Sequence, residues 1–238
     1  MENLKTGVIK NRRDGLSYSY EMKQIGLEQL TQVQALHNEV IDSLPDADLC
    51  WRFPLDHLTR YLGEDGVTVG VFVAERLVGF RVLYFAGERD DNPGLDLGLA
   101  PEELAQVAHL PLSNVHPDYT GNGLQKTMTL YAVAIAEHMR PFYYLCSNVS
   151  PKNYPSMAEK FAIGMRVAAL KVKYGAFWRY VFCRDMRQAW KVNEESALLV
   201  ESEDCARQTE LLAQGYCGVR LERSVAGTKI VFARRLPE

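Results

Sequence analysis

The residues best suited to chemistry lie near the middle of the chain, where two glycines separate a strand-like segment from an apolar helix. Residues 113–125 read SNVHPDYTGNGLQ. The first backbone N–H groups of a helix have no partner within it, and the helix dipole adds positive potential there. Because Gly121 and Gly123 carry no side chain, a phosphate can approach these N–H groups closely. The pattern indicates an anion site, with a tight turn that binds nothing as the alternative.

The same segment differs from the two best-known nucleotide-binding loops. It lacks the GxxxxGK[ST] pattern of P-loop proteins and the third glycine of the Rossmann fingerprint.

The five cysteines are scattered, with neither a CxxC motif nor a nearby histidine pair. We therefore expect no metal site and no disulfide framework, which favours a reducing compartment.

The elements around this loop predict an α+β fold with a mostly antiparallel sheet. Apolar residues recur every three or four positions over residues 27–44, and most regularly over residues 124–139, which is typical of helices. Alternating valines start a predicted β-hairpin over residues 67–85, and residues 107–115 are expected to form one strand. The remaining predictions are helices at 54–63, 156–163 and 205–214, strands at 142–149 and 197–200, a hairpin at 167–183, and two strands around Gly227.

We expect three segments along the chain. Residues 1–17 are polar and patternless, which predicts a mobile leader. Residues 18–187 hold the predicted domain, and residues 188–238 form an extension that packs on it. That extension has three possible roles: completing the sheet, covering a substrate cleft or making a dimer interface.

Composition narrows the classes of partner. The chain has 238 residues with a formal net charge of −3, and 47% of them are hydrophobic. A basic excess, which nucleic-acid binding needs, is missing. No apolar run approaches the roughly 18 residues of a membrane span, and no apolar stretch follows the basic residues near the N-terminus. We therefore expect a cytoplasmic protein that binds neither nucleic acid nor membrane.

The central segment resembles the pyrophosphate-binding motif of the GCN5-related N-acetyltransferase (GNAT) family, in particular an uncharacterised bacterial subgroup. That motif, [RQ]xxGx[GA] after a V-x-P strand end, is similar to residues 115–125. Asn153, followed by Gly164 before the next predicted strand, resembles the second family motif. The resemblance covers residues 18–186 and implies a mixed, mostly antiparallel sheet flanked by helices.

The resemblance also implies a cofactor and a reaction. Acetyl-CoA would be the co-substrate, and its acetyl group would pass directly to a primary amine of a small molecule in a ternary complex, without a metal. The enzyme would be a monomer or a homodimer. The residues that the resemblance assigns to the cofactor are Asn114, Val115, Thr120, Gly121, Asn122, Gly123, Leu124, Gln125, Asn153 and Ser156.

Two positions in the motif depart from the family pattern. Thr120 stands where arginine or glutamine is usual, and Gln125 where glycine or alanine is usual. Because the family's phosphate contacts are mainly backbone N–H groups, these changes are compatible with binding. Lys160 stands where the family often has a tyrosine that acts as general acid. A catalytically degenerate GNAT-fold protein that binds acyl-CoA or a protein partner is therefore the alternative function.

The general base has several candidates. His109 lies six residues before Val115, so strand alternation places both on one face. The ordinary pKa of histidine suits a general base, although a hydrogen-bonded histidine at a strand edge explains the residue equally well. Glu102 and Glu103 are alternatives, which the start of a solvated helix also explains.

Overall fold

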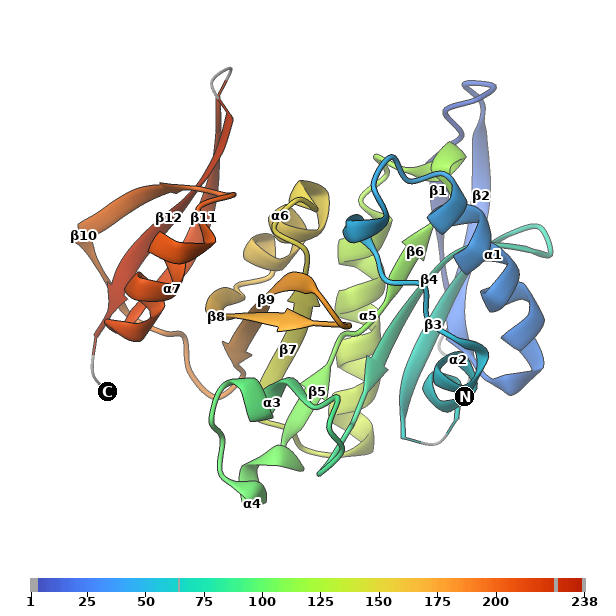
Figure 1. Cartoon of the computed structure of the whole chain (residues 1–238). Coiled ribbons are helices and arrows are strands. Elements are labelled where there is room, and N and C mark those ends of the chain that lie inside the picture. The colour runs from blue at the N-terminus through green and yellow to red at the C-terminus, as the bar shows by residue number, and fades with distance from the viewer. Residues whose placement is uncertain (1–3, 64, 225–226, 237–238) are drawn as a thin grey trace. The chain divides into compact units, whose positions relative to one another are not determined.

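The structure is a computed structural model that describes residues 4–63, 65–224 and 227–236, and its helices and strands are drawn in Figure 1. The chain divides into two compact units. Unit 1 combines Met1–Phe85 with Leu110–Pro141, and unit 2 combines Ala86–His109 with Phe142–Glu238. The division differs from the three consecutive segments expected, because each unit joins stretches that are far apart in the sequence.

Unit 1 contains an antiparallel sheet in the order β1-β2-β3-β4, with β6 paired to β4. Its strands are β1 (Lys5–Lys10), β2 (Ser17–Ile25), β3 (Gly66–Val73), β4 (Arg76–Tyr84) and β6 (Ser113–Val115). The predicted hairpin is confirmed as β3 and β4. Almost all of β3 is buried, which shows that both faces of this sheet are covered.

Helices cover the sheet of unit 1. They are α1 (Leu30–Asp42), α2 (Leu55–Tyr61) and α5 (Leu124–Met139), with short 3-10 turns η1 (Leu27–Gln29), η2 (Ala47–Leu49) and η3 (Pro117–Tyr119). The helix α1 packs on β4 and β6, and α5 packs on β3 and β4. The bounds of α5 agree with the predicted helix, and its Met128 lies against Gly79 of β4.

Unit 2 contains the strands β5 (Val107–His109), β7 (Tyr144–Val149), β8 (Arg166–Lys173) and β9 (Phe177–Asp185). They lie in the order β5-β7-β9-β8, with β5 parallel to β7 and the other pairs antiparallel. Its helices are α3 (Pro93–Asp96), α4 (Pro101–Leu104) and α6 (Tyr154–Ala162). These elements confirm the predicted α+β class with a mostly antiparallel sheet.

The C-terminal extension continues the sheet of unit 2. It consists of β10 (Val192–Glu201), α7 (Cys205–Ala213), β11 (Tyr216–Ser224) and β12 (Gly227–Arg235), in the order β8-β11-β12-β10. Gly218 of β11 pairs with Val167 of β8, where an added Cβ would lie 2.8 Å from the Val167 side chain. The buried Tyr180 hydroxyl of β9 also donates to Gln208 Oε1 of α7 at 2.6 Å. Within unit 2, these contacts fix the extension to the strands β8 and β9 that precede it in the chain.

Two expectations about strands were wrong. Residues 5–10 of the expected mobile leader form β1, which pairs with β2 along its whole length. Residues 107–115 form two strands rather than one, because strand pairing is interrupted around Pro111. Proline has no N–H group to donate to a neighbouring strand. The strand β5 belongs to unit 2 and β6 to unit 1.

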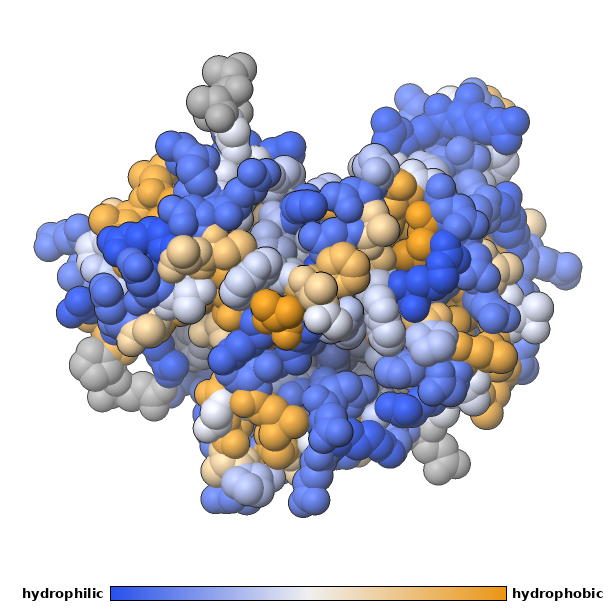
Figure 2. All heavy atoms as spheres, viewed as in Figure 1, coloured by the Kyte–Doolittle hydropathy of each residue, from blue (hydrophilic) through white to orange (hydrophobic). Residues whose placement is uncertain are grey.

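The surface is mainly hydrophilic on the face that Figure 2 shows, where apolar residues form small separate patches. The exposed apolar side chains are distributed over many elements, from Val8 of β1 to Leu199 of β10. Among the described residues, no helix combines the length and the hydropathy needed to cross a membrane.

Candidate cofactor-binding site

The loop that precedes α5 is shaped by two glycines in unit 1. Gly121 and Gly123 adopt φ angles of +82° and +71°, in the left-handed region that side chains disfavour. A Cβ added at either position would meet nothing within 4 Å. The glycines are therefore needed for backbone conformation, and the space above them is open.

The backbone of this loop presents unused hydrogen-bond donors. In the described part of the chain, no atom accepts a hydrogen bond from the N–H groups of residues 121–126. The first amide of α5 that is bonded is that of Thr127, which donates to the carbonyl of Gly123 at 3.1 Å. Because α5 is 16 residues long, its dipole adds positive potential at this end. The loop in which the sequence predicts an anion site therefore has a row of unbonded N–H donors at the start of a helix.

The side chains of the loop are largely occupied within unit 1. Asn122 accepts a hydrogen bond from the backbone N–H of Lys10 at 2.9 Å and returns one to the Lys10 carbonyl at 2.8 Å. The Thr120 hydroxyl donates to the carbonyl of Pro117 at 2.9 Å. Asn122 can therefore bind a ligand mainly through its backbone N–H. The N–H of Thr120 also donates to the Pro117 carbonyl, so Thr120 shapes the loop rather than offering a free donor.

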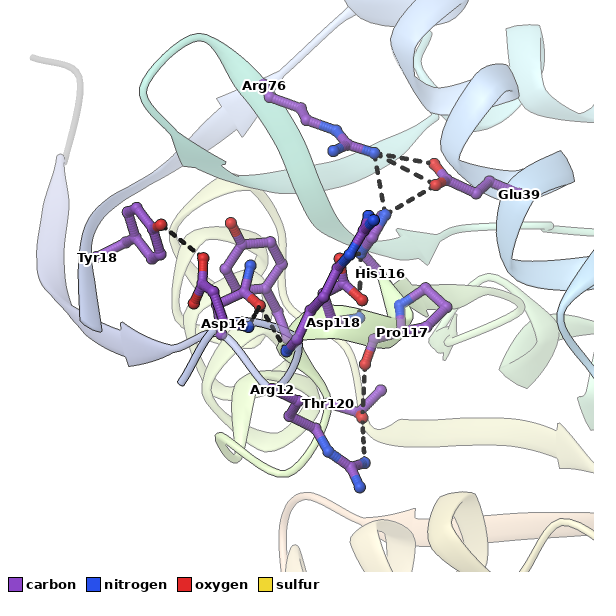
Figure 3. Close-up of polar contacts among 12 residues, drawn as sticks. Arg12, Asp14, Tyr18, Glu39, Arg76, His116, Pro117, Asp118 and Thr120 are labelled. Atoms are coloured by element: carbon purple, nitrogen blue, oxygen red, sulfur yellow. Dashed lines mark hydrogen bonds and ion pairs between the residues drawn. The ribbon is translucent and has the colours of Figure 1, made fainter. Parts of the chain in front are cut away.

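A polar cluster secures the start of the loop (Figure 3). His116 is buried, and its Nδ1 accepts from the N–H of Asp118 at 3.1 Å. Its Nε2 lies 2.8 Å from Glu39 Oε1, and Arg76 lies 3.2 Å from the other carboxylate oxygen. Arg76 Nη2 also lies 3.0 Å from His116 Nε2, so the imidazole, the carboxylate and the guanidinium form one polar group. These bonds tie the loop to α1 and β4, so His116 is a structural residue.

The strand β6 has one edge open within unit 1. His116 N–H donates to the Val78 carbonyl and Val82 N–H to the Leu112 carbonyl, so the residues between them alternate in direction. The backbone groups of Asn114 face β4, and those of Ser113 and Val115 face the other way. Among the described strands, β6 pairs only with β4. The outward groups can therefore pair with an extended ligand.

The side chain of Asn114 has a different role from the one its position suggests. Its Oδ1 accepts from His37 Nδ1 at 2.8 Å, and His37 Nε2 accepts from the N–H of Phe53 at 3.0 Å. All three residues are buried, and burial lowers the pKa of His37. Asn114 thus joins β6 to α1 and to the segment before α2. His37 is therefore a buried residue of α1 with both ring nitrogens hydrogen-bonded.

In unit 2, Asn153 and Ser156 form a helix cap. Asn153 Oδ1 accepts from the N–H of Ser156 at 3.1 Å, which begins α6 two residues before the predicted start. The structure therefore uses the side-chain oxygen of Asn153 and the amide of Ser156 for capping.

The candidate base His109 is in an unfavourable environment. It is 2% exposed, and neither ring nitrogen has a hydrogen-bond partner among the described residues. Burial, with the charges of Lys173 and Lys160 adding to it, lowers the pKa of His109 to about 3. A group with this pKa takes a proton from an ammonium ion far less readily than an ordinary histidine.

The other candidates for proton transfer are also engaged within unit 2. Lys160 is buried and forms an ion pair with Glu159. Glu103 accepts from the Tyr144 hydroxyl at 2.7 Å, and this bond lowers the pKa of the Glu103 carboxyl. Cys146 is buried beside Cys183, which together with burial raises the pKa of its thiol. Lys160 and Glu103 are already bonded in this structure, and Cys146 is a buried thiol rather than an activated nucleophile.

One contributor to the loop was missed by the sequence reasoning. The residues that join β1 and β2 contact the loop through Lys10 and through Arg12, whose Nη1 donates to the Thr120 hydroxyl at 2.9 Å. Arg12 and Thr120 lie 108 positions apart. No spacing rule connects residues at that separation; the polar composition of residues 1–17 even favoured the wrong interpretation.

Comparison with known proteins shows what this architecture is similar to. No protein-family model matches the chain, and no curated protein sequence matches it. The ribosomal-protein-S18-alanine N-acetyltransferase from Escherichia coli matches with a TM-score of 0.53 and 13% identity, over 71% of this chain and 96% of that one. An acetyltransferase of the GNAT family from Streptococcus pneumoniae matches with a TM-score of 0.52 and 13% identity, over 70% and 98%.

A further solved structure, yncA from Salmonella typhimurium with its cofactor acetyl-CoA, has a TM-score of 0.52 and 11% identity, over 73% of this chain and 97% of that one. All three identities are low, so the likeness concerns the fold. This chain has the GNAT fold.

Proposed function

We propose that this protein is an acetyl-CoA-dependent N-acetyltransferase that acts on a primary amine of a small molecule. The observation that carries the proposal is the set of unbonded N–H groups at residues 121–126, above two left-handed glycines in a chain with the GNAT fold. A structural neighbour at similar TM-score holds acetyl-CoA. The pyrophosphate of the cofactor would accept hydrogen bonds from this loop.

The open edge of β6 supports the placement of the rest of the cofactor. The amide groups of a pantetheine arm can bond to the outward backbone groups of Ser113 and Val115, as an added strand does. In this proposal Asn114 positions the strand through His37, and Asn153 and Ser156 shape the start of α6. The assignment of Val115 and of residues 121–125 to the cofactor is retained through their backbone, whereas the N–H of Thr120 already donates to the Pro117 carbonyl.

The reaction proposed is direct acetyl transfer. The amine nitrogen bonds to the thioester carbonyl carbon, the C–S bond breaks, and the amine loses a proton while the CoA thiolate gains one. Neither His109 nor Lys160 is given a role in these proton transfers, because the first is a weakened base and the second is ion-paired. A cytoplasmic location, supported by five free thiols, and a monomeric or homodimeric state complete the proposal.

The environments of His109 and Lys160, which leave neither suited to proton transfer, also favour a second candidate. This is a GNAT-fold protein that binds acyl-CoA without turnover. The two are separated by incubating the protein with acetyl-CoA and a panel of small amines and measuring the CoA released. Release above the amine-free and protein-free blanks supports the enzyme. Binding without release from any amine supports the second candidate.

The cofactor site itself is tested with Gly123→Asp, measured by calorimetry against acetyl-CoA. The carboxylate would stand in the open space over the amides and repel phosphate, so we expect binding to be lost. Gly215→Asp is the matched control: Gly215 has a φ of +83°, its added Cβ also meets nothing within 4 Å, and it lies in the extension. Equal acetyl-CoA affinity in the two variants would refute the site.

A further inference from the structure

We infer that Arg12, from the segment between β1 and β2, is a phosphate-binding residue of the cofactor site. The inference rests on the proposed function, because it concerns the place where the pyrophosphate of acetyl-CoA is proposed to lie. By this inference, the hairpin formed by β1 and β2 takes part in binding the cofactor.

The loop itself lacks a cation. Residues 116–125 read HPDYTGNGLQ and contain one acidic residue, Asp118, with no lysine or arginine. Thr120 occupies the position where the motif it resembles has arginine or glutamine. A pyrophosphate on residues 116–125 would therefore meet N–H groups and a helix dipole but no lysine or arginine side chain. The next cation along the chain is Lys126, an exposed residue in the first turn of α5.

Arg12 supplies a cation at that position in space (Figure 3). Its Nη1 donates to the Thr120 hydroxyl at 2.9 Å, and that hydroxyl donates its own proton to the Pro117 carbonyl. This bond uses one of the five N–H donors of the guanidinium. No other described residue bonds or ion-pairs with the Arg12 side chain. The remaining donors are available to phosphate oxygens, which arginine binds in pairs.

The backbone around Arg12 is fastened to the loop. Arg12 N–H donates to the Asp118 carbonyl at 2.6 Å, and Asn122 exchanges two hydrogen bonds with Lys10. The turn that follows is closed by Asn11, whose Oδ1 accepts from the N–H of Arg13 at 2.8 Å. A guanidinium held this way loses less conformational freedom on binding than one at the end of a free terminus.

The test compares Arg12→Gln with its neighbour Arg13→Gln, using coenzyme A and pantetheine as ligands in calorimetry. Arg13 is also exposed, and its side chain forms no hydrogen bond or ion pair with a described residue; its charge only contributes to the lowered pKa of the Asp14 carboxyl. We expect Arg12→Gln to raise the Kd for coenzyme A about tenfold, equivalent to about 1.4 kcal/mol, and Arg13→Gln to leave it unchanged. Pantetheine, which lacks phosphates, should bind both variants like the parent protein.

A rescue variant separates recognition from hairpin docking. Returning the cation to the loop with Arg12→Gln/Thr120→Arg should restore most of the affinity for coenzyme A. Equal Kd values for Arg12→Gln and Arg13→Gln would overturn the inference and leave the proposed function standing. Weaker pantetheine binding in Arg12→Gln, without rescue, would overturn it in favour of a structural role. Failure of the parent protein to bind coenzyme A would overturn the proposed function and this inference together.

Discussion

Replacing His109 by methionine removes a buried imidazole of unit 2 that contributes to the pH dependence of the free energy of unfolding. The ring is 2% exposed, and its pKa is lowered to about 3, chiefly by burial, with Lys173 and Lys160 acting in the same direction. In the unfolded chain the ring returns to its ordinary value of about 6.5. Unfolding therefore takes up a proton at mildly acidic pH.

The sign and size of the effect follow from this difference. Between about pH 6.5 and pH 3 the unfolded state binds a proton that the folded state does not, so stability falls as the pH falls below 6.5. Lowering the pH from about 7.5 to about 5.5 should cost the parent protein about 1.4 kcal/mol through this residue. His109→Met should lack this share of the loss, because methionine does not titrate.

Urea unfolding at the two pH values gives the free energy of unfolding of each protein. The effect of His109 is the decrease in this free energy on acidification of the parent protein, minus the decrease in His109→Met. The control is His138→Gln, which removes an exposed histidine from α5 in place of the buried one. If His109→Met and the parent lose the same stability on acidification, the ring is not held neutral by burial. His109 would then again be a candidate for the general base.

Two further predictions concern unit 2. Lys160→Met should destabilise the protein by about 3–5 kcal/mol in urea unfolding, because the buried Glu159 carboxylate loses the ion pair that offsets its charge. The double variant with Glu159→Gln should recover much of this, and a loss below about 1 kcal/mol would show that the pair acts like a surface pair. Truncation after Arg187 removes the strands paired beyond β8 and the partner of the buried Tyr180 hydroxyl. The shortened chain should aggregate in size-exclusion chromatography, and a soluble, monodisperse product would contradict this.

Elements with a clear apolar period could be predicted from the sequence. Over residues 124–139 the apolar side chains recur at helical spacing, and α5 has these bounds because one face packs on β3 and β4. The alternating valines of β3 likewise predicted a strand. In both elements the apolar residues recur at this spacing because they are the ones that pack in the core.

Elements without such a period could not be predicted. In β1 only Ile9 is buried, so an edge strand that is held by backbone pairing with β2 resembles a polar leader. Pro111 stands within an apolar run, and composition alone did not show that it separates β5 from β6. The glycine loop was found from its local sequence, whereas the contact between Arg12 and Thr120 depends on tertiary structure.

The central claim is that the N–H groups before α5 bind the pyrophosphate of acetyl-CoA, and the most direct measurement is a titration of the parent protein with acetyl-CoA and with CoA, by calorimetry and by thermal unfolding. The account predicts saturable binding of both. At a ligand concentration of about 100 times Kd the protein should gain about 2.7 kcal/mol of stability, which raises Tm by about 5–10 °C. Absence of heat and of any Tm shift with either ligand would contradict the account.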